Sequence, residues 1–220
     1  MDAACEKLAQ KVNFWFRKRG PAIYFSHLDL MRHFCRSLRR AGLRPRLTAG
    51  FNPRPRLVFP HPMPLGVASE CETAEVEFCE ELPLGEVFAR LRRADGGVLE
   101  FLRCEAMRPV KAGHVVARCT YRVGNLPPAA ASPEFAAWLR ETLAAPAITM
   151  TRGHAEKARA VDIRPYILSL RLADGELEAE LAHLPEGAGR IDEIARLAAA
   201  RLGCPWQTLA LTKTAVAFRE

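Results

Sequence analysis

The chain has no long apolar run and no secretion signal. None of its apolar stretches approaches the roughly 18 residues that a membrane-spanning helix needs. The N-terminus is mixed and polar, whereas a signal peptide is basic and then apolar. We therefore expect a cytoplasmic protein with no membrane partner. With 49% apolar and 26% charged residues, the composition is that of a folded globular protein and not of a disordered one.

The seven cysteines lack the spacing of a metal site. No C-x2-C pair and no C-x3-C-x2-C triplet occurs anywhere in the chain. Their number is odd and they are scattered, so a disulfide framework is not expected either. Cys71 and Cys79, the nearest pair, are interpreted as free thiols that act as small buried hydrophobes. We expect no metal and no cofactor in this chain, and no iron–sulfur cluster.

The common catalytic motifs are missing as well. There is no G-x-S-x-G around a serine, no P-loop and no G-x-G-x-x-G. Ser69 lies beside Glu70 and Glu72 without any such context. A serine hydrolase and a P-loop enzyme are therefore not supported.

Acidic residues are nearly missing from residues 17–56. This stretch holds one acid, Asp29, against eleven basic residues, ten of them arginine, in a chain of net charge +7. The planar guanidinium group suits phosphate and stacks on bases better than an ammonium group does. We favour a polyanion-binding segment, and an ordinary solvated surface is the alternative. The basic residues are Arg17, Lys18, Arg19, Arg32, Arg36, Arg39, Arg40, Arg44, Arg46, Arg54 and Arg56.

Hydrophobic periodicity predicts a β-α-β-β-α-β order for residues 1–110. Residues 12–17 alternate as a strand, and strands are also expected near residues 56–60, 73–79 and 98–107. A second helix is expected over residues 84–94.

The first helix should begin with Ser26 as N-cap and Asp29 in a capping box, and end at Gly42. Its buried stripe is predicted to be Leu28, Met31, Phe34, Cys35 and Leu38, whereas His33 and the arginines Arg32, Arg36, Arg39 and Arg40 should face solvent.

Residues 111–220 fit the same order. A strand over residues 115–123 precedes a helix that Ser132 caps, and further strands are expected near residues 148–151, 163–172 and 177–183. A helix over residues 192–202 and a strand over residues 208–218 complete it. The predicted fold class is α+β, with two tandem ferredoxin-like units, antiparallel sheets and a boundary near residues 109–113. Residues 152–164 are expected to form a second polar loop.

A proline-rich segment over residues 50–66 is the densest motif. Its five prolines stiffen the chain and reduce the entropy lost on binding. Phe51 beside Arg54 and Arg56 predicts a rigid arm that meets single-stranded nucleic acid, and an edge-protecting connection is the alternative. The predicted nucleic-acid-binding residues are Arg32, Arg36, Arg39, Arg40, Arg44, Arg46, Phe51, Asn52, Arg54, Arg56 and His61.

Two histidines have possible chemical roles. His27 belongs to the first turn of the arginine-bearing helix, where a neutral imidazole is a candidate general base for RNA cleavage. It is the one catalytic candidate, and spacing provides no second acid or base. His61 is expected either to bond a base or to hold the loop together.

Three strings resemble a known family. They are Tyr-Phe-Ser-His-Leu-Asp at residues 24–29, Gly-Phe-Asn-Pro-Arg-Pro at residues 50–55, and residues 61–70 from His61 to Glu70. They are similar to the bacterial radical-SAM-linked protein family, and Lys157, residues 162–164 and residues 189–190 fit its pattern too. Members are encoded beside, or fused behind, cobalamin-type radical SAM proteins. The resemblance implies a radical SAM partner that acts in trans, to which this chain presents a substrate.

The lead hypothesis is an RNA-binding accessory protein that assists a radical SAM enzyme on ribosomal or transfer RNA. We expect a binding protein rather than an enzyme acting on its own. One alternative is a metal-independent endoribonuclease or RNA-modifying enzyme that uses His27, by analogy with CRISPR repeat-processing endoribonucleases. The other is a protein adaptor that docks the radical enzyme through the basic helix.

Overall fold

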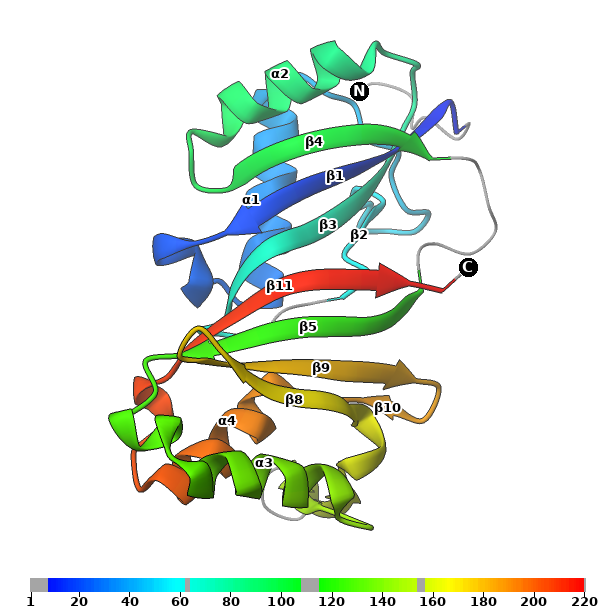
Figure 1. Cartoon of the computed structure of the whole chain (residues 1–220). Coiled ribbons are helices and arrows are strands. Elements are labelled where there is room, and N and C mark those ends of the chain that lie inside the picture. The colour runs from blue at the N-terminus through cyan, green and yellow to red at the C-terminus, as the bar shows by residue number, and fades with distance from the viewer. Residues whose placement is uncertain (1–7, 62–63, 108–114, 154–156, 220) are drawn as a thin grey trace. The chain divides into compact units, whose positions relative to one another are not determined.

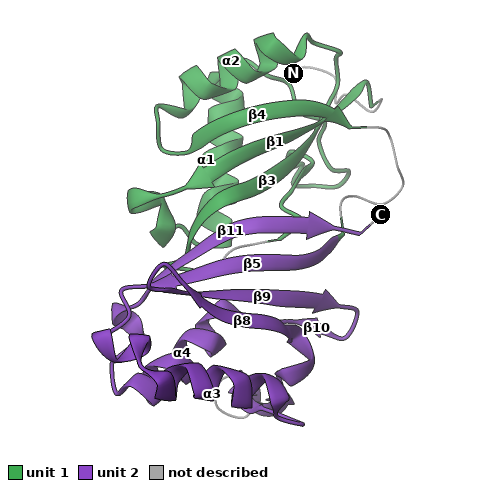
Figure 2. Cartoon of the chain, viewed as in Figure 1, with its two compact units in different colours: residues 1–115 green, residues 116–220 purple. Residues whose placement is uncertain are grey.

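The computed structural model describes residues 8–61, 64–107, 115–153 and 157–219 (Figure 1). Within them the protein is α+β, with four α helices and antiparallel strand pairs. The chain divides into two compact units, residues 1–115 and residues 116–220 (Figure 2). Among the described residues, no helix has the length and apolar character needed to cross a membrane.

In unit 1, β1 is the central strand of the sheet. It pairs on one side with β4 and on the other with β3, and the short β2 pairs with β3, every pairing antiparallel. The elements are β1 (Gln10–Lys18), the 3-10 helix η1 (Gly20–Tyr24), α1 (His27–Arg40), β2 (Leu57–Val58), β3 (Ala68–Phe78), α2 (Leu84–Asp95) and β4 (Glu100–Met107).

The core of unit 1 is rich in phenylalanine. Alternate residues of β1, Val12, Phe14 and Phe16, are fully buried, so they share one face of the sheet. Phe34 of α1 packs against that face, with its ring centre 5.8 Å from Phe14 and 6.1 Å from Phe16. Val87 of α2 belongs to the same buried cluster. Edge-to-face contacts of this kind fix the position of α1 on the sheet.

Unit 2 also contains an antiparallel sheet and two α helices. Its sheet has the order β10-β9-β5-β11, with β8 also on β9, and a separate hairpin joins β6 to β7. The elements are β5 (Val116–Gly124), η2 (Pro128–Ala131), α3 (Pro133–Ala144), β6 (Thr149–Arg152), β7 (Arg159–Asp162), η4 (Arg164–Tyr166), β8 (Ile167–Ala173), β9 (Glu176–Leu184), β10 (Gly187–Ala188), α4 (Ile191–Leu202), η5 (Trp206–Thr208) and β11 (Ala210–Phe218).

The predicted N-caps of α1 and α3, the first α helix of each unit, are confirmed. Ser26 Oγ accepts the N–H of Asp29 at 3.2 Å, and Asp29 Oδ2 accepts the N–H of Ser26 at 3.3 Å, which is a complete capping box. Ser132 caps α3 in the same way through the N–H of Phe135. Gly42, with φ of +65°, follows the end of α1 in the left-handed conformation expected there.

Several predicted strands have different limits. The strand expected over residues 56–60 shortens to β2, because a proline on either side leaves few free N–H groups. By contrast, β3 begins at Ala68, five residues earlier than predicted. The strand expected from residue 163 begins at Ile167, after the 3-10 turn η4. In the polar loop predicted over residues 152–164, Arg152 is buried at the end of β6 and residues 159–162 form β7, which pairs with β6. Residues 154–156 of this loop lie outside the described residues.

The predicted buried face of α1 is partly wrong. Leu28 is 56% exposed, whereas His33, predicted to face solvent, is 7% exposed. The buried face of α1 is instead the one that carries Leu30, Phe34 and Leu38, which belong to the core of unit 1. His33 tolerates burial because its imidazole has a carboxylate partner, described below, that hydropathy alone does not reveal.

Cysteine chemistry also differs from expectation at one position. Cys79 is disulfide-bonded, so its interpretation as a free thiol was wrong. Cys35, Cys71, Cys104, Cys119 and Cys204 are not in disulfide bonds. Burial raises the pKa of the Cys35 and Cys104 thiols, which keeps both protonated and unreactive at neutral pH.

Candidate nucleic-acid interface

The arginines of α1 lie on the side of the helix away from the core. Arg32, Arg36, Arg39 and Arg40 are all exposed, as the helical spacing predicted. Arg39 and Arg40 occupy the last turn, where the helix dipole favours positive charge. At the other end, the hydrogen bond from Ser26 lowers the pKa of Asp29, so this residue carries a negative charge near Arg32.

Acidic residues from elsewhere in unit 1 neutralise part of the basic segment. Glu77 of β3 pairs with Arg46 at 3.2 Å and with Arg56 at 3.7 Å. Arg17 and Arg19 both face Glu100 of β4, at 2.6 and 4.0 Å. Among the described residues, none forms a hydrogen bond or ion pair with the guanidinium of Arg36, Arg39 or Arg54. The charge available to a ligand is therefore smaller than the sequence count and lies on α1 and at Arg54.

Residues 47–55, hereafter the arm, form a mostly exposed loop between α1 and β2. An isolated bridge joins Leu47 to Pro55, and the N–H of Thr48 donates to the carbonyl of Arg54 at 2.8 Å. The N–H of Arg54 donates in turn to Thr48 Oγ1 at 3.0 Å. These bonds brace the base of the arm.

The tip of the arm presents an aromatic ring to solvent. Phe51 is fully exposed, and the neighbouring Asn52 and Arg54 are exposed too. Gly50, with φ of +119°, makes the turn before the ring. The Phe51 ring buries nothing in the folded protein, so both of its faces are accessible for stacking.

His27 is the first residue of α1 and is exposed. Its ring lies edge-on to Phe59, with centres 5.7 Å apart. Among the described residues, no carboxylate or second imidazole is hydrogen-bonded to His27. The geometry places this side chain beside an aromatic ring and provides no partner to activate it as a base. His61 is half-buried after Phe59 and is less accessible than the arm tip.

Apolar side chains surround the start of α1. Tyr24, Leu28 and Leu65 are 67%, 56% and 63% exposed. The N–H of Gly66 donates to the carbonyl of Ile23 at 2.9 Å, which places residues 64–66 beside η1. We call Tyr24, Leu28 and Leu65 the apolar patch. The strings at residues 24–29 and 61–70 therefore meet at one end of unit 1.

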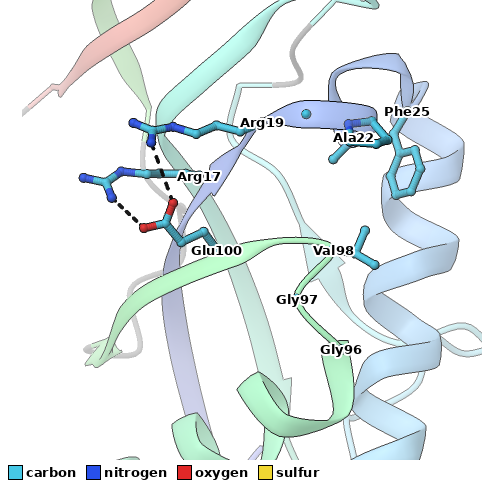
Figure 3. A pocket seen from close by; sticks show the side chains of 10 residues that line it. Arg17, Arg19, Ala22, Phe25, Gly96, Gly97, Val98 and Glu100 are labelled. Atoms are coloured by element: carbon cyan, nitrogen blue, oxygen red, sulfur yellow. Dashed lines mark hydrogen bonds and ion pairs between the residues drawn. The ribbon is translucent and has the colours of Figure 1, made fainter.

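A cavity of about 690 Å³ opens where β1 runs into η1 (Figure 3). Arg17, Arg19 and Glu100 form its charged side, and Phe25 and Val98 lie on its apolar side (Figure 3). Sequence reasoning missed this site because its walls come from segments far apart in the chain. The adjacent glycines Gly96 and Gly97, both with positive φ, were the one local signal of an unusual turn there.

A buried polar pair lies behind the cavity. His33 Nε2 of α1 is 2.6 Å from Asp95 Oδ1 at the end of α2, and Asp95 is 2% exposed. Asp95 Oδ2 also accepts the N–H of Leu99 at 2.8 Å, which closes the turn that carries Gly96, Gly97 and Val98. On its other side, the His33 ring packs against Phe25 with centres 5.6 Å apart.

Asp162 and Arg164, two of the unit 2 residues that fit the family pattern, form hydrogen bonds within unit 2. Asp162 Oδ1 accepts the N–H groups of Ile148 and Arg164, and these bonds lower its pKa. The guanidinium of Arg164 donates to the carbonyls of Leu143, at the end of α3, and of Ile167. These hydrogen bonds connect the β6–β7 hairpin to α3. They use the polar groups of Asp162 and Arg164 that could otherwise bind a ligand.

Comparisons with known proteins identify the family of the chain. A search of the curated proteins returned no match. A family model described as "Uncharacterized protein conserved in bacteria (DUF2344)" matches residues 11–191, which is well over half of the chain and spans both units. The chain belongs to this bacterial family.

Proposed function

We propose that the protein binds RNA, with unpaired nucleotides stacked on Phe51 and phosphates held by the arginines of α1 and by Arg54. The observation that carries this is the fully exposed Phe51 on a braced arm. Base–aromatic stacking is tolerant of sequence and adds about 1–3 kcal/mol per base. Guanidinium groups without a partner among the described residues supply phosphate contacts with no ion pair to break first.

The sheet face opposite the helices is a poorer candidate surface. There Lys11 pairs with Glu75 at 2.7 Å, and Trp15 Nε1 donates to Glu105 at 3.0 Å. The Arg103 guanidinium already lies over the Trp15 ring, 4.5 Å from its centre. Because these groups satisfy one another, RNA gains less there than on α1 and the arm.

The proposal extends to a cytoplasmic setting and a partner. We assign ribosomal or transfer RNA as the target and a radical SAM enzyme as the protein that acts on it in trans. The support is the resemblance of the strings at residues 24–29, 50–55 and 61–70. Those strings supply the start of α1, the arm tip and the apolar patch, so they lie where RNA and a partner would meet this chain.

We also propose that each unit is a ferredoxin-like fold. In unit 1 the sheet runs β4-β1-β3-β2, with α1 after β1 and α2 after β3. In unit 2 the corresponding strands run β11-β5-β9-β8, with α3 and α4 in the same places and the β6–β7 hairpin inserted before β8. Both orders are those of a β-α-β-β-α-β unit. An experimental structure with a different strand order in either unit would contradict this.

Fluorescence anisotropy tests the RNA proposal. Labelled single-stranded RNA, structured RNA and duplex DNA are titrated with the full chain over a salt series. We expect RNA binding whose logarithm falls linearly with log salt, at a slope of about −0.7 per phosphate contact for single strands. The double variant Arg36→Glu/Arg39→Glu should weaken binding and flatten the slope.

The matched control is Arg140→Glu, an exposed arginine on α3 of unit 2. It changes charge on a helix that the proposal does not use. Equal losses from the α1 variant and this control would show that overall charge, and not the α1 surface, drives binding. No binding of any RNA above that of duplex DNA would overturn the proposal.

A protein adaptor is the second candidate, and the apolar patch favours it. Tyr24 and Leu65 are both more than half exposed, and exposed apolar groups are candidate protein interaction sites. Capture of a radical SAM protein that survives nuclease treatment and is lost in Leu28→Asp/Leu65→Asp would support the adaptor. If nuclease treatment abolishes the capture, RNA and not a direct protein contact links the two proteins, which supports the RNA proposal. The enzyme alternative, in which His27 acts as base, lacks such a supporting contact and ranks below both.

A further inference from the structure

The cavity between Phe25 and Glu100 is not used by the proposed RNA surface. It lies in unit 1 where β1 ends, and the residues that line it include neither the α1 arginines nor the arm. Its volume of about 690 Å³ falls within the range of small-molecule sites. The question is which chemical class its walls would recognise.

One side of the cavity suits a flat apolar group. Phe25 is half-buried, and Val98 is 40% exposed on the opposing turn (Figure 3). Pro21 and Ala22 of η1 complete this wall without adding a charged group. An aromatic ring opposite an aliphatic side chain is a stacking site for a planar base.

The other side suits a phosphate. Arg17 and Arg19 line it together with one carboxylate, Glu100. Arg17 Nε is buried and has no hydrogen-bond partner among the described residues. Arg19 also pairs with Glu70 at 3.1 Å, so a phosphate would compete with ion pairs whose side chains are partly exposed and therefore weak.

The site is held in shape before any ligand arrives. The pairing of β1 with β4 is interrupted by a bulge between Trp15 and Phe16, next to the cavity. His33 packs on Phe25, and its partner Asp95 closes the turn that carries Val98. One buried pair thus positions both walls of the apolar side, which reduces the ordering that a ligand must impose.

We propose that this cavity binds a nucleoside 5′-monophosphate, with the base between Phe25 and Val98 and the phosphate on Arg17 and Arg19. Two sources carry that chemistry: a free nucleotide, and the 5′-phosphorylated end of an RNA strand. We assign the RNA end, an assignment that rests on the proposed function. The arginines of α1 and the arm then hold the body of the strand, and the cavity reads its end.

Calorimetry with the full chain tests the shared chemistry first. AMP and GMP should bind, with adenosine and inorganic phosphate each clearly weaker. Arg19→Gln should reduce AMP affinity about tenfold, because a hydrogen bond to a charged group is lost. Val98→Trp, which fills the apolar side, should abolish binding. The matched control Leu102→Trp, at a 39% exposed site on β4 that does not line the cavity, should not change it.

Anisotropy with one RNA sequence bearing either a 5′-phosphate or a 5′-hydroxyl then separates the sources. Tighter binding of the phosphorylated strand, lost in Val98→Trp, supports the RNA end. Equal binding of both strands with AMP binding intact supports a free nucleotide and overturns the RNA end. RNA binding without any AMP binding or 5′-phosphate preference overturns the cavity proposal and leaves the proposed function standing.

AMP binding without any RNA binding overturns the proposed function and keeps the nucleotide site. Phosphate binding as tight as AMP, or equal loss in Val98→Trp and Leu102→Trp, overturns the cavity proposal. Where Val98→Trp fails to fold, Arg19→Gln decides the test, because the Arg19 side chain is 52% exposed and its replacement leaves the core untouched.

Discussion

His33 and Asp95 form a buried hydrogen bond of 2.6 Å that joins the middle of α1 to the end of α2. Ser37 Oγ lies 3.5 Å from both groups and is fully buried. The pair thus connects the two helices of unit 1 through a buried polar contact.

We predict that His33→Ala destabilises the protein by about 3–5 kcal/mol, because it removes the shortest side-chain partner of the buried Asp95 carboxyl group. Asp95→Asn should cost less, since the side-chain oxygen can still accept the N–H of Leu99. Urea unfolding of the full chain provides both values. A cost for His33→Ala of under about 1 kcal/mol, the range of an exposed pair, would show that the pair contributes little.

This pair shows that contacts between residues far apart in the sequence are not predicted by local patterns. The capping box at Ser26 and Asp29, the cap at Ser132 and the amphipathic strand β1 were predicted correctly, because each depends on residues close together in sequence. His33 was misplaced because its partner lies 62 residues away. A polar residue on a helix is predicted to be exposed unless its partner is known.

The candidate site shows the same division. The exposure of the α1 arginines follows from helical period alone, whereas the pairing of Arg46 and Arg56 with Glu77 required the sheet register. The cavity could not be predicted, because it depends on how the turn at Gly96 and Gly97 packs beside η1. The positions of the arginines could be predicted from the sequence. The ion pairs that neutralise some of them could not, because their acidic partner lies far away in the chain.

Phe51 offers a prediction that separates stacking from charge. Phe51→Ala should weaken single-stranded RNA binding by about 1–3 kcal/mol, the contribution of one stacked base, and leave the salt slope unchanged. Because the Phe51 side chain is fully exposed, stability should stay within about 0.5 kcal/mol of wild type. Anisotropy over a salt series measures both effects, with Phe51→Trp as the control that keeps a stacking ring. Retained affinity in Phe51→Ala would remove the arm tip from the interface.

Arg152 and Glu193 provide a stability prediction for unit 2. Arg152 Nε and Nη2 donate to the two carboxylate oxygens of Glu193 at 2.6 and 2.7 Å, and both side chains are buried. Arg152→Ala should cost about 3–5 kcal/mol by leaving Glu193 unpaired in the interior. The double variant Arg152→Met/Glu193→Leu should be milder than the sum of the single changes.

The control for this pair is Arg171, which pairs with Glu178 across β8 and β9 and is 71% exposed. Arg171→Ala should cost no more than about 1 kcal/mol, because exposed ion pairs are screened by solvent. Chemical denaturation compares the two. If Arg152→Ala behaves like Arg171→Ala, the hairpin of β6 and β7 is not anchored through Glu193.

Asp162 predicts an acid-dependent loss of stability. The N–H groups of Ile148 and Arg164 donate to its carboxylate at 2.8 and 3.0 Å and hold its pKa below the usual aspartate range. Because the folded-state pKa is the lower one, the unfolded chain binds the proton first as the pH falls. The stabilising contribution is therefore complete above the usual aspartate pKa and is lost as the pH falls through the folded value. Asp162→Asn should be less stable at neutral pH and should lose less stability on acidification.

Asp162→Ser separates the charge from the hydrogen bonds in that experiment. Serine keeps an oxygen that can accept an N–H group but does not titrate. It should therefore remove the acid-dependent part while retaining some of the stability at neutral pH. Urea midpoints measured over a pH series from neutral into the acid range give the slope for each variant. If the urea midpoints of wild type and both variants fall with pH at the same slope, other carboxylates, and not Asp162, cause the loss of stability in acid.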